Sequence, residues 1–188
     1  MQYVCGFMMS WDMQEFLLIR KTHPDWMKGK WNGIGGKIEA FTYNTRTGKM
    51  LIGSPGEIIR IKCEAEIGDY SVEEETPQEA MIREFHEETG IQTTIKRWHC
   101  FYIEEFKKDH NGDNGTKLYY FAAFGDETKR EQLSSPTDEE VKTHNLIDVF
   151  WDQKDYIYNL PYIIHMIIYN MRKGSFYQLN PQGVNSVQ

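Results

Sequence analysis

The stretch that decides the fold reads Arg83-Glu84-Phe85-His86-Glu87-Glu88-Thr89-Gly90-Ile91. On an α-helix, Glu84, Glu87 and Glu88 stand at positions i, i+3 and i+4, so their carboxylates share one face. Two like charges about 4 Å apart repel by roughly 4 kcal/mol at an effective dielectric constant of about 20. A hard divalent cation such as Mg²⁺ or Mn²⁺ removes that repulsion and prefers oxygen ligands. A solvated acidic face on an amphipathic helix is the competing interpretation of the pattern.

Both ends of this helix are marked in the sequence. Thr76 fits the N-cap, Pro77 the first helical position and Glu79 the third, which makes a capping box. Gly90 fits the position just after the C-terminus, where a left-handed residue ends many helices. The sequence therefore predicts a helix over Thr76 to Thr89.

The residues around the helix favour the metal interpretation. Glu75 is followed by seven residues and then by Arg83-Glu84, and Gly35-Gly36-Lys37-Ile38-Glu39 lies upstream. The pattern strongly resembles the Nudix box, which runs glycine, five residues, glutamate, seven residues and then Arg-Glu-U-x-Glu-Glu-x-Gly-U, where U is a bulky apolar residue. Every fixed position from Glu75 onward matches. The departure is in the first spacer, because 38 residues separate Gly36 from Glu75.

The resemblance implies a fold. We expect an α/β protein with a Nudix-type α/β/α sandwich, a mixed central sheet and an inserted hairpin over about residues 41–74. A single domain is expected over residues 1–174, with a flexible tail over 175–188. The insertion is compatible with the box if Gly36 and Glu75 stay close in space, as the two ends of a hairpin would.

The resemblance also implies a site. The protein is expected to be an enzyme, a Nudix pyrophosphohydrolase, with Mg²⁺ or Mn²⁺ as its cofactor. Glu87 or Glu84 would help to deprotonate the attacking water, and Arg83 would orient a glutamate. The expected metal ligands are the main-chain carbonyl of Gly36 and the carboxylates of Glu84, Glu87, Glu88 and Glu140. Glu139 is the alternative to Glu140, and a plain acidic surface loop is the alternative to both.

A second segment points to a nucleotide. Trp31-Asn32-Gly33-Ile34-Gly35-Gly36-Lys37 resembles the segment before the box in MutT-like enzymes that hydrolyse oxidised purine nucleoside triphosphates. There the asparagine bonds the purine edge, and an amide offers a donor and an acceptor in one plane. An Asn-Gly turn is the competing interpretation. The expected substrate-binding residues are Asn32, Trp26, Lys37, Tyr158 and Asn159, with core packing as the alternative for the tyrosine.

The other elements follow from alternation and turn residues. A short strand, a tight turn and a second strand are expected over Trp31–Glu39. The remaining predictions are a hairpin of Gln2–Ser10 with Glu15–Ile19, strands over Thr93–Phe106, Lys117–Phe124 and Ile147–Phe150, an acidic loop over Ser134–Lys142 and a C-terminal helix over Asp155–Lys173.

Composition limits the class of protein. Of the 188 residues, 40% are hydrophobic, which suffices for a core and excludes global disorder. A protein with a formal net charge of −7 is poorly suited to binding long nucleic acid through its phosphates. The three cysteines form no CxxC pair, which favours a reducing compartment. We therefore expect a cytoplasmic protein with no membrane partner, in which the insertion could form a lid or an arm for a homodimer.

These observations lead to a hypothesis of function. The protein is expected to be a metal-dependent nucleoside triphosphate diphosphatase that converts a purine nucleotide, with 8-oxo-dGTP favoured, to a nucleoside monophosphate and pyrophosphate. Alternatives with the same metal machinery are hydrolysis of ADP-ribose, a dinucleoside polyphosphate, a nucleotide sugar or capped RNA. A Nudix-fold sensor that binds a nucleotide without cleaving it is the alternative from another class.

Overall fold

The structure is a computed structural model that describes residues 1–44, 50–53, 70–106, 115–129, 137–174, 178–180 and 183–185. In this part of the chain the central sheet has six strands, in the order β3-β2-β1-β8-β7, with β9 also paired to β2. The strands are β1 (Gln2–Met9), β2 (Glu15–Arg20), β3 (Trp31–Asn32), β7 (His99–Phe106), β8 (Thr116–Phe124) and β9 (Glu140–Asn145). The sheet is mixed, because β1 and β8 run parallel while the other pairs run antiparallel.

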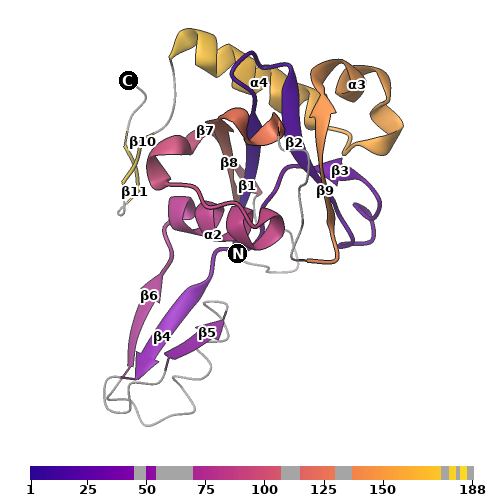
Figure 1. Cartoon of the computed structure of the whole chain (residues 1–188). Coiled ribbons are helices and arrows are strands. Elements are labelled where there is room, and N and C mark those ends of the chain that lie inside the picture. Colours follow the sequence, from indigo (N-terminus) through magenta and orange to yellow (C-terminus); the bar gives the residue numbers. More distant parts are fainter. Residues whose placement is uncertain are drawn as a thin grey trace.

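Alternation along the strands divides the apolar residues between two cores. Val4 and Met8 of β1 and Leu17 of β2 pack with helix α2 (Pro77–Thr89). Phe7 and Phe16 point the other way and pack with helix α4 (Leu160–Lys173). The two helices therefore lie on opposite faces of the sheet (Figure 1). This arrangement is the predicted α/β/α sandwich.

Helix α2 begins and ends where the capping signals predict. The hydroxyl of Thr76 accepts a hydrogen bond from the Glu79 amide, and the Glu79 carboxylate accepts one from the Thr76 amide at 2.9 Å. Gly90 ends the helix in the left-handed conformation, with φ of 70°. The helix packs so close to the sheet that a Cβ at Gly6 of β1 would collide with the Met81 side chain.

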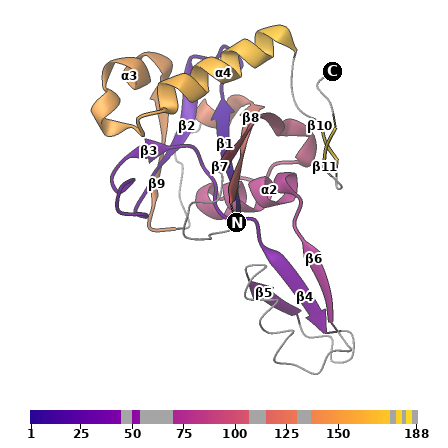
Figure 2. The ribbon, with the colours of Figure 1, turned by 180° about the vertical axis from the view of Figure 1, so that it is seen from behind.

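The insertion forms a separate small sheet that projects from the core (Figures 1 and 2). Its strands are β4 (Ala40–Asn44), β5 (Met50–Gly53) and β6 (Tyr70–Glu74), in the antiparallel order β5-β4-β6. The described part therefore has one strand more than the expected hairpin. Its two ends meet where the Glu75 amide donates to the Glu39 carbonyl at 3.1 Å, so Gly36 and Glu75 stay close despite the long spacer.

Several segments differ from the expectation. The strand predicted from Thr93 begins only at His99, after the 3₁₀ turn at Ile95–Arg97. The predicted strand at Ile147–Phe150 is instead part of helix α3 (Leu146–Trp151), because only Val149 of its apolar residues is fully buried while Ile147 and Phe150 are exposed. The predicted acidic loop ends in β9, whose first residue Glu140 pairs with Arg20 of β2. Residues 134–136 lie outside the described residues.

The C-terminal helix starts later than predicted. Helix α4 begins at Leu160, with Pro161 in its first turn, and the 3₁₀ turn η3 (Gln153–Asp155) precedes it. Two other 3₁₀ turns are η1 (Ile95–Arg97) and η2 (Asp126–Lys129). After α4, β10 (Gln178–Asn180) pairs with β11 (Gly183–Asn185), and the mobility of the tail stays a prediction. No helix in the described ranges is long and apolar enough to cross a membrane.

Candidate active site

The glycine-rich turn lies directly against strand β1. Gly6 and Ile34 exchange two backbone hydrogen bonds, at 2.7 and 2.9 Å, and the Gly36 carbonyl accepts one from the Val4 amide at 2.9 Å. Gly35 has φ of 151°, and a Cβ there would collide with the Val4 carbonyl. A Cβ at Gly36 would collide with the Glu84 carboxylate. Glycine at both positions thus lets the turn fit between β1 and the box helix.

Arg83 organises one group of carboxylates. Its guanidinium binds Glu75 through two hydrogen bonds of 2.7 and 2.9 Å, and it donates to Glu84 at 2.9 Å and to Glu87 at 3.0 Å. It also donates to the Lys37 carbonyl at 2.9 Å. Burial alone would lower the pKa of Arg83, but the bonds to Glu75 and the charge of Glu84 raise it. Arg83 therefore positions carboxylates, and Glu75 anchors it.

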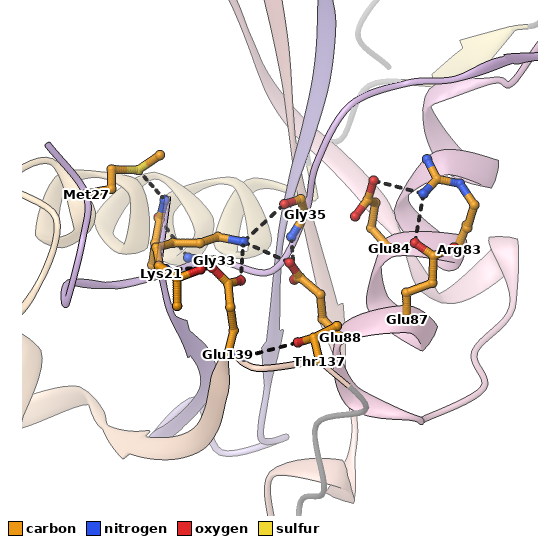
Figure 3. Close-up of polar contacts among 12 residues, drawn as sticks. Lys21, Met27, Gly33, Gly35, Arg83, Glu84, Glu87, Glu88, Thr137 and Glu139 are labelled. Carbon is orange, nitrogen blue, oxygen red and sulfur yellow. Dashed lines mark hydrogen bonds and ion pairs between the residues drawn. The ribbon is translucent and has the colours of Figure 1, made fainter. Parts of the chain in front are cut away.

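Lys21 organises the other group, as Figure 3 shows. Its ammonium nitrogen lies 2.8 Å from the Glu88 carboxylate, 3.2 Å from the Glu139 carboxylate and 3.3 Å from the Gly35 carbonyl. The second oxygen of Glu88 accepts from the Gly35 amide at 3.0 Å. The Lys21 side chain is only 11% exposed, so this ammonium is a buried charge surrounded by acceptors. Sequence analysis did not identify Lys21 as a site residue.

The two candidate loop carboxylates lie in different places. Glu139 faces the box helix, bonds Lys21 and accepts from both the amide and the hydroxyl of Thr22, at 2.7 and 3.0 Å. Glu140 instead pairs with Arg20 at 3.5 Å, and both side chains are more than half exposed. The structure thus brings Glu139, and not Glu140, beside Glu88.

Burial controls the protonation of these carboxyls. Desolvation raises the pKa of Glu88 to about 7, against the lowering effect of Lys21, and the charges of Glu84 and Glu139 add to the increase. Desolvation also raises the pKa of Glu84, although Arg83 opposes it. For Glu139, burial acts in the same direction, but the hydrogen bonds from Thr22 and the charge of Lys21 lower the pKa overall.

The box carboxylates are therefore divided between two internal cations. Glu84 and Glu87 turn toward Arg83, and Glu88 turns toward Lys21 (Figure 3). Within the described ranges, no three His, Cys, Asp or Glu side chains converge in an arrangement that could hold a metal ion. The donor set still fits Mg²⁺ or Mn²⁺ chemically, since it consists of carboxylate and carbonyl oxygens and includes a buried carboxylate with a raised pKa.

A cavity of about 850 Å³ adjoins this cluster. Lys21, Gly35 and Gly36 belong to its wall, and so do four of the expected substrate-binding residues, namely Trp26, Asn32, Tyr158 and Asn159. Lys37, the fifth, is not among the lining residues. The segment before α4 reaches the cavity because the Ile157 amide donates to the Trp31 carbonyl at 3.0 Å.

The polar groups of this cavity are oriented by their neighbours. The Asn32 side-chain oxygen accepts from the Gly33 amide at 2.8 Å, which leaves the amide nitrogen near the Met27 sulfur at 3.5 Å. The Asn159 side chain bonds the Tyr120 hydroxyl, which itself donates to Glu104 at 3.1 Å. The Asn159 oxygen is buried without a partner in the structure. Tyr120 and Glu104 were not predicted as substrate-binding residues.

Comparison with known proteins identifies the family. A family model for the NUDIX domain matches residues 3–161, and no curated protein matches the chain. The NUDIX domain of Shewanella oneidensis NrtR complexed with ADP ribose is 16% identical, with a TM-score of 0.52, 91% of this chain and 88% of that chain covered.

Two further solved structures have the same fold. Shewanella oneidensis NrtR complexed with a 27mer DNA is 16% identical, with a TM-score of 0.54, 94% of this chain and 64% of that chain covered. The E. coli dihydroneopterin triphosphate pyrophosphohydrolase is 13% identical, with a TM-score of 0.51, 90% of this chain and 95% of that chain covered. The predicted fold and the predicted class of enzyme, a Nudix pyrophosphohydrolase, are confirmed at the level of the family. The chain belongs to the NUDIX family.

Proposed function

We propose that the protein is a metal-dependent nucleoside triphosphate diphosphatase that hydrolyses a purine nucleotide, with an 8-oxo-dGTP-like base favoured, to a nucleoside monophosphate and pyrophosphate. One observation carries the proposal. A single cavity is lined at one part by Lys21 and Gly35, which bond Glu88 of the carboxylate cluster, and elsewhere by the aromatic residues Trp26 and Tyr158 and the amides Asn32 and Asn159. This combination suits a ligand with a polyphosphate and a flat, polar-edged base.

The residues proposed to hold the metal are Glu84, Glu87, Glu88, Glu139 and the Gly35 carbonyl. Glu139 replaces Glu140 in this set, because Glu139 lies beside Glu88. The Gly35 carbonyl replaces that of Gly36, which is bonded to Val4 in strand β1. When bound, Mg²⁺ or Mn²⁺ neutralises the phosphates and lowers the pKa of a bound water.

The chain supplies the rest of the chemistry. Water attacks in line, the anhydride bond between the first and second phosphates breaks, and pyrophosphate leaves. Glu87 or Glu84 accepts the proton of the water. Arg83 bonds both carboxylates, at 2.9 and 3.0 Å, and so positions whichever of them acts as the base.

Two amides are proposed to read the base. Asn32 offers its amide nitrogen, because its oxygen is already bonded to the Gly33 amide. Asn159 offers an oxygen that has no partner. A donor and an acceptor together complement a base edge that carries an acceptor and a donor, which purines have. Trp26 and Tyr158 line the same cavity, are 65% and 87% exposed as residues, and can pack on the ring.

A panel of substrates tests this proposal. The protein is incubated with Mg²⁺ and 8-oxo-dGTP, dGTP, ADP-ribose, a diadenosine polyphosphate or capped RNA, and the products are separated by chromatography. We expect pyrophosphate and a monophosphate, formed fastest from a purine triphosphate. Preferred cleavage of ADP-ribose would refute the choice of substrate, and tight binding without turnover would favour a sensor. Asn32→Ala should reduce discrimination between bases; an equal loss for all nucleotides would show that Asn32 is structural.

A further inference from the structure

The buried ammonium of Lys21 makes more contacts than a surface lysine needs. Its three acceptors come from three separate segments: Glu88 from helix α2, Glu139 from the loop before β9 and the Gly35 carbonyl from the glycine-rich turn. An ammonium has three donors, so all of its hydrogen-bonding capacity is used. Lys21 thus joins the elements that form the site.

The pairs around Lys21 are also electrostatically coupled. The charge of Glu139 disfavours the negative charge of Glu88, and Lys21 favours the charged form of both carboxylates. Both carboxylates are largely buried, with 10% and 15% exposed side chains. The folded protein loses stability when the one cation between two buried carboxylates is removed, unless another cation replaces it.

We propose that Lys21 is a resident counter-cation that holds Glu88 and Glu139 together and competes with the divalent metal for these carboxylates and for the Gly35 carbonyl. This inference rests on the proposed metal-dependent function. The ammonium and a hard divalent ion need the same oxygen atoms, so they cannot both be fully bonded to them. Lys21 also lines the cavity, which gives the displaced ammonium a place to go.

Competition and support predict opposite effects on metal affinity when Lys21 is removed. If Lys21 only supported the metal ligands, its removal would weaken metal binding. If Lys21 competes for them, its removal makes binding tighter while the metal-free protein becomes less stable. Lys21→Met is the appropriate change, because it removes the charge and keeps an apolar stem of similar length.

The experiment measures Mn²⁺ binding to the full chain by calorimetry and by paramagnetic resonance, with thermal unfolding in EDTA and in Mn²⁺. For Lys21→Met we expect the Mn²⁺ dissociation constant to fall about tenfold or more. The melting temperature in EDTA should fall by about 4 °C or more, and Mn²⁺ should restore it. Lys21→Arg keeps the charge and should bind Mn²⁺ no more tightly than the wild type.

Lys28→Met is the matched control, because it removes the same charge from the exposed loop after β2 without touching the cluster. It should leave Mn²⁺ affinity within about twofold of the wild type. Weaker or unchanged binding by Lys21→Met, in a wild type that binds Mn²⁺, overturns the role of Lys21 and leaves the proposed function intact. Equal tightening by Lys21→Arg or Lys28→Met overturns it as well.

The remaining outcomes separate the two proposals. If the wild type binds no Mn²⁺ but Lys21→Met does, the competition is supported and the metal-dependent function fails. If neither binds, both fail. Where Lys21→Met does not fold in EDTA, it is refolded with Mn²⁺ and followed by tryptophan fluorescence. Recovery of the native spectrum supports the exchange of one cation for the other, and no recovery overturns it.

Discussion

At the scale of single residues, the candidate site is organised by internal ion pairs. Arg83 and Lys21 each bond at least two carboxylates, and together they account for all of the box glutamates. Removing one partner of such a partly buried ion pair destabilises the fold, because the remaining charge is left without a partner. The same pairs keep the carboxylates close together in the protein without a metal.

Replacing a box glutamate by glutamine separates chemistry from folding. Glutamine keeps the size of the side chain and one accepting oxygen but removes the charge that a metal needs. We expect Glu87→Gln and Glu88→Gln each to lower kcat for the best nucleotide by about a hundredfold or more. Circular dichroism should be unchanged. Near-normal turnover by either variant would show that its carboxylate does not hold the metal.

His144 makes the stability depend on pH. It is buried, accepts or donates a bond of 2.8 Å with the Tyr156 hydroxyl, and its other ring nitrogen has no partner in the structure. Burial lowers the pKa of His144 from 6.5 to about 4. As the pH falls, this histidine therefore binds a proton in the unfolded chain before it does so in the folded protein. The free energy of unfolding falls for this reason by about 3 kcal/mol at most between pH 6.5 and 4.

Glu88 changes the free energy of unfolding in the opposite direction over an overlapping pH range. Its folded pKa is raised from 4.5 to about 7, so its protonation stabilises the fold as the pH falls. We therefore compare wild type with His144→Gln by urea unfolding at pH 7.5 and at pH 5. The wild type should lose more free energy of unfolding between these values than the variant does. Identical losses would show that His144 titrates normally.

At the scale of elements, period-2 alternation explains which residues reach the site. Leu17 and Ile19 of β2 belong to the core under helix α2, and Lys21 follows on the same side. Val141 of β9 belongs to that core too, which puts Glu139 on the site side and Glu140 on the other. Strand parity was therefore the signal that could have identified Lys21 and favoured Glu139.

Glu75 links the end of the insertion to the box helix. Its carboxylate accepts two bonds from Arg83 and one from the Glu39 amide at 3.0 Å, and its side chain is 6% exposed. We expect Glu75→Gln to lower the free energy of unfolding by about 2 to 3 kcal/mol. Activity should also fall, because Arg83 would no longer be held against Glu84.

The matched control for this measurement is Glu87→Gln. Glu87 bonds the same guanidinium, but its side chain is 54% exposed. An exposed pair contributes less than about 1 kcal/mol, so this variant should unfold at nearly the wild-type urea concentration. Equal destabilisation by both substitutions would contradict the structural role assigned to Glu75.

At the scale of the whole molecule, the site lies where the two cores and the sheet meet. Helix α2 brings the carboxylates from one face, and the segment before α4 brings Tyr158 and Asn159 from the other. The glycine-rich turn runs between them along β1. The cavity therefore depends on both helices keeping their place on the sheet, so metal binding should stabilise the entire fold.

Removing and restoring the metal tests this dependence. A ligand that binds only the folded state stabilises it by about 2.7 kcal/mol at a hundred times its dissociation constant. For a chain of this size that corresponds to a rise in melting temperature of about 5 to 10 °C. We expect this rise on adding Mg²⁺ to protein treated with EDTA, together with recovery of activity. Activity that persists in EDTA would contradict metal dependence.

The sequence alone determined the box helix with its caps and the family. These are local properties, because capping, alternation and the spacing of the box act within a few residues. It did not determine the helical state of residues 146–151, where pairing of β9 with β2 ends the strand and burial of Val149 favours a helix.

Only the tertiary structure decided how the charges are shared. Lys21 and Glu139 lie 118 residues apart in the sequence, and their contact depends on the pairing of β2 with β9. The same holds for Asn32 and Asn159, which line one cavity because the segment before α4 bonds Trp31 of β3. Long-range pairing sets such contacts, and no local pattern encodes the partner of a buried charge.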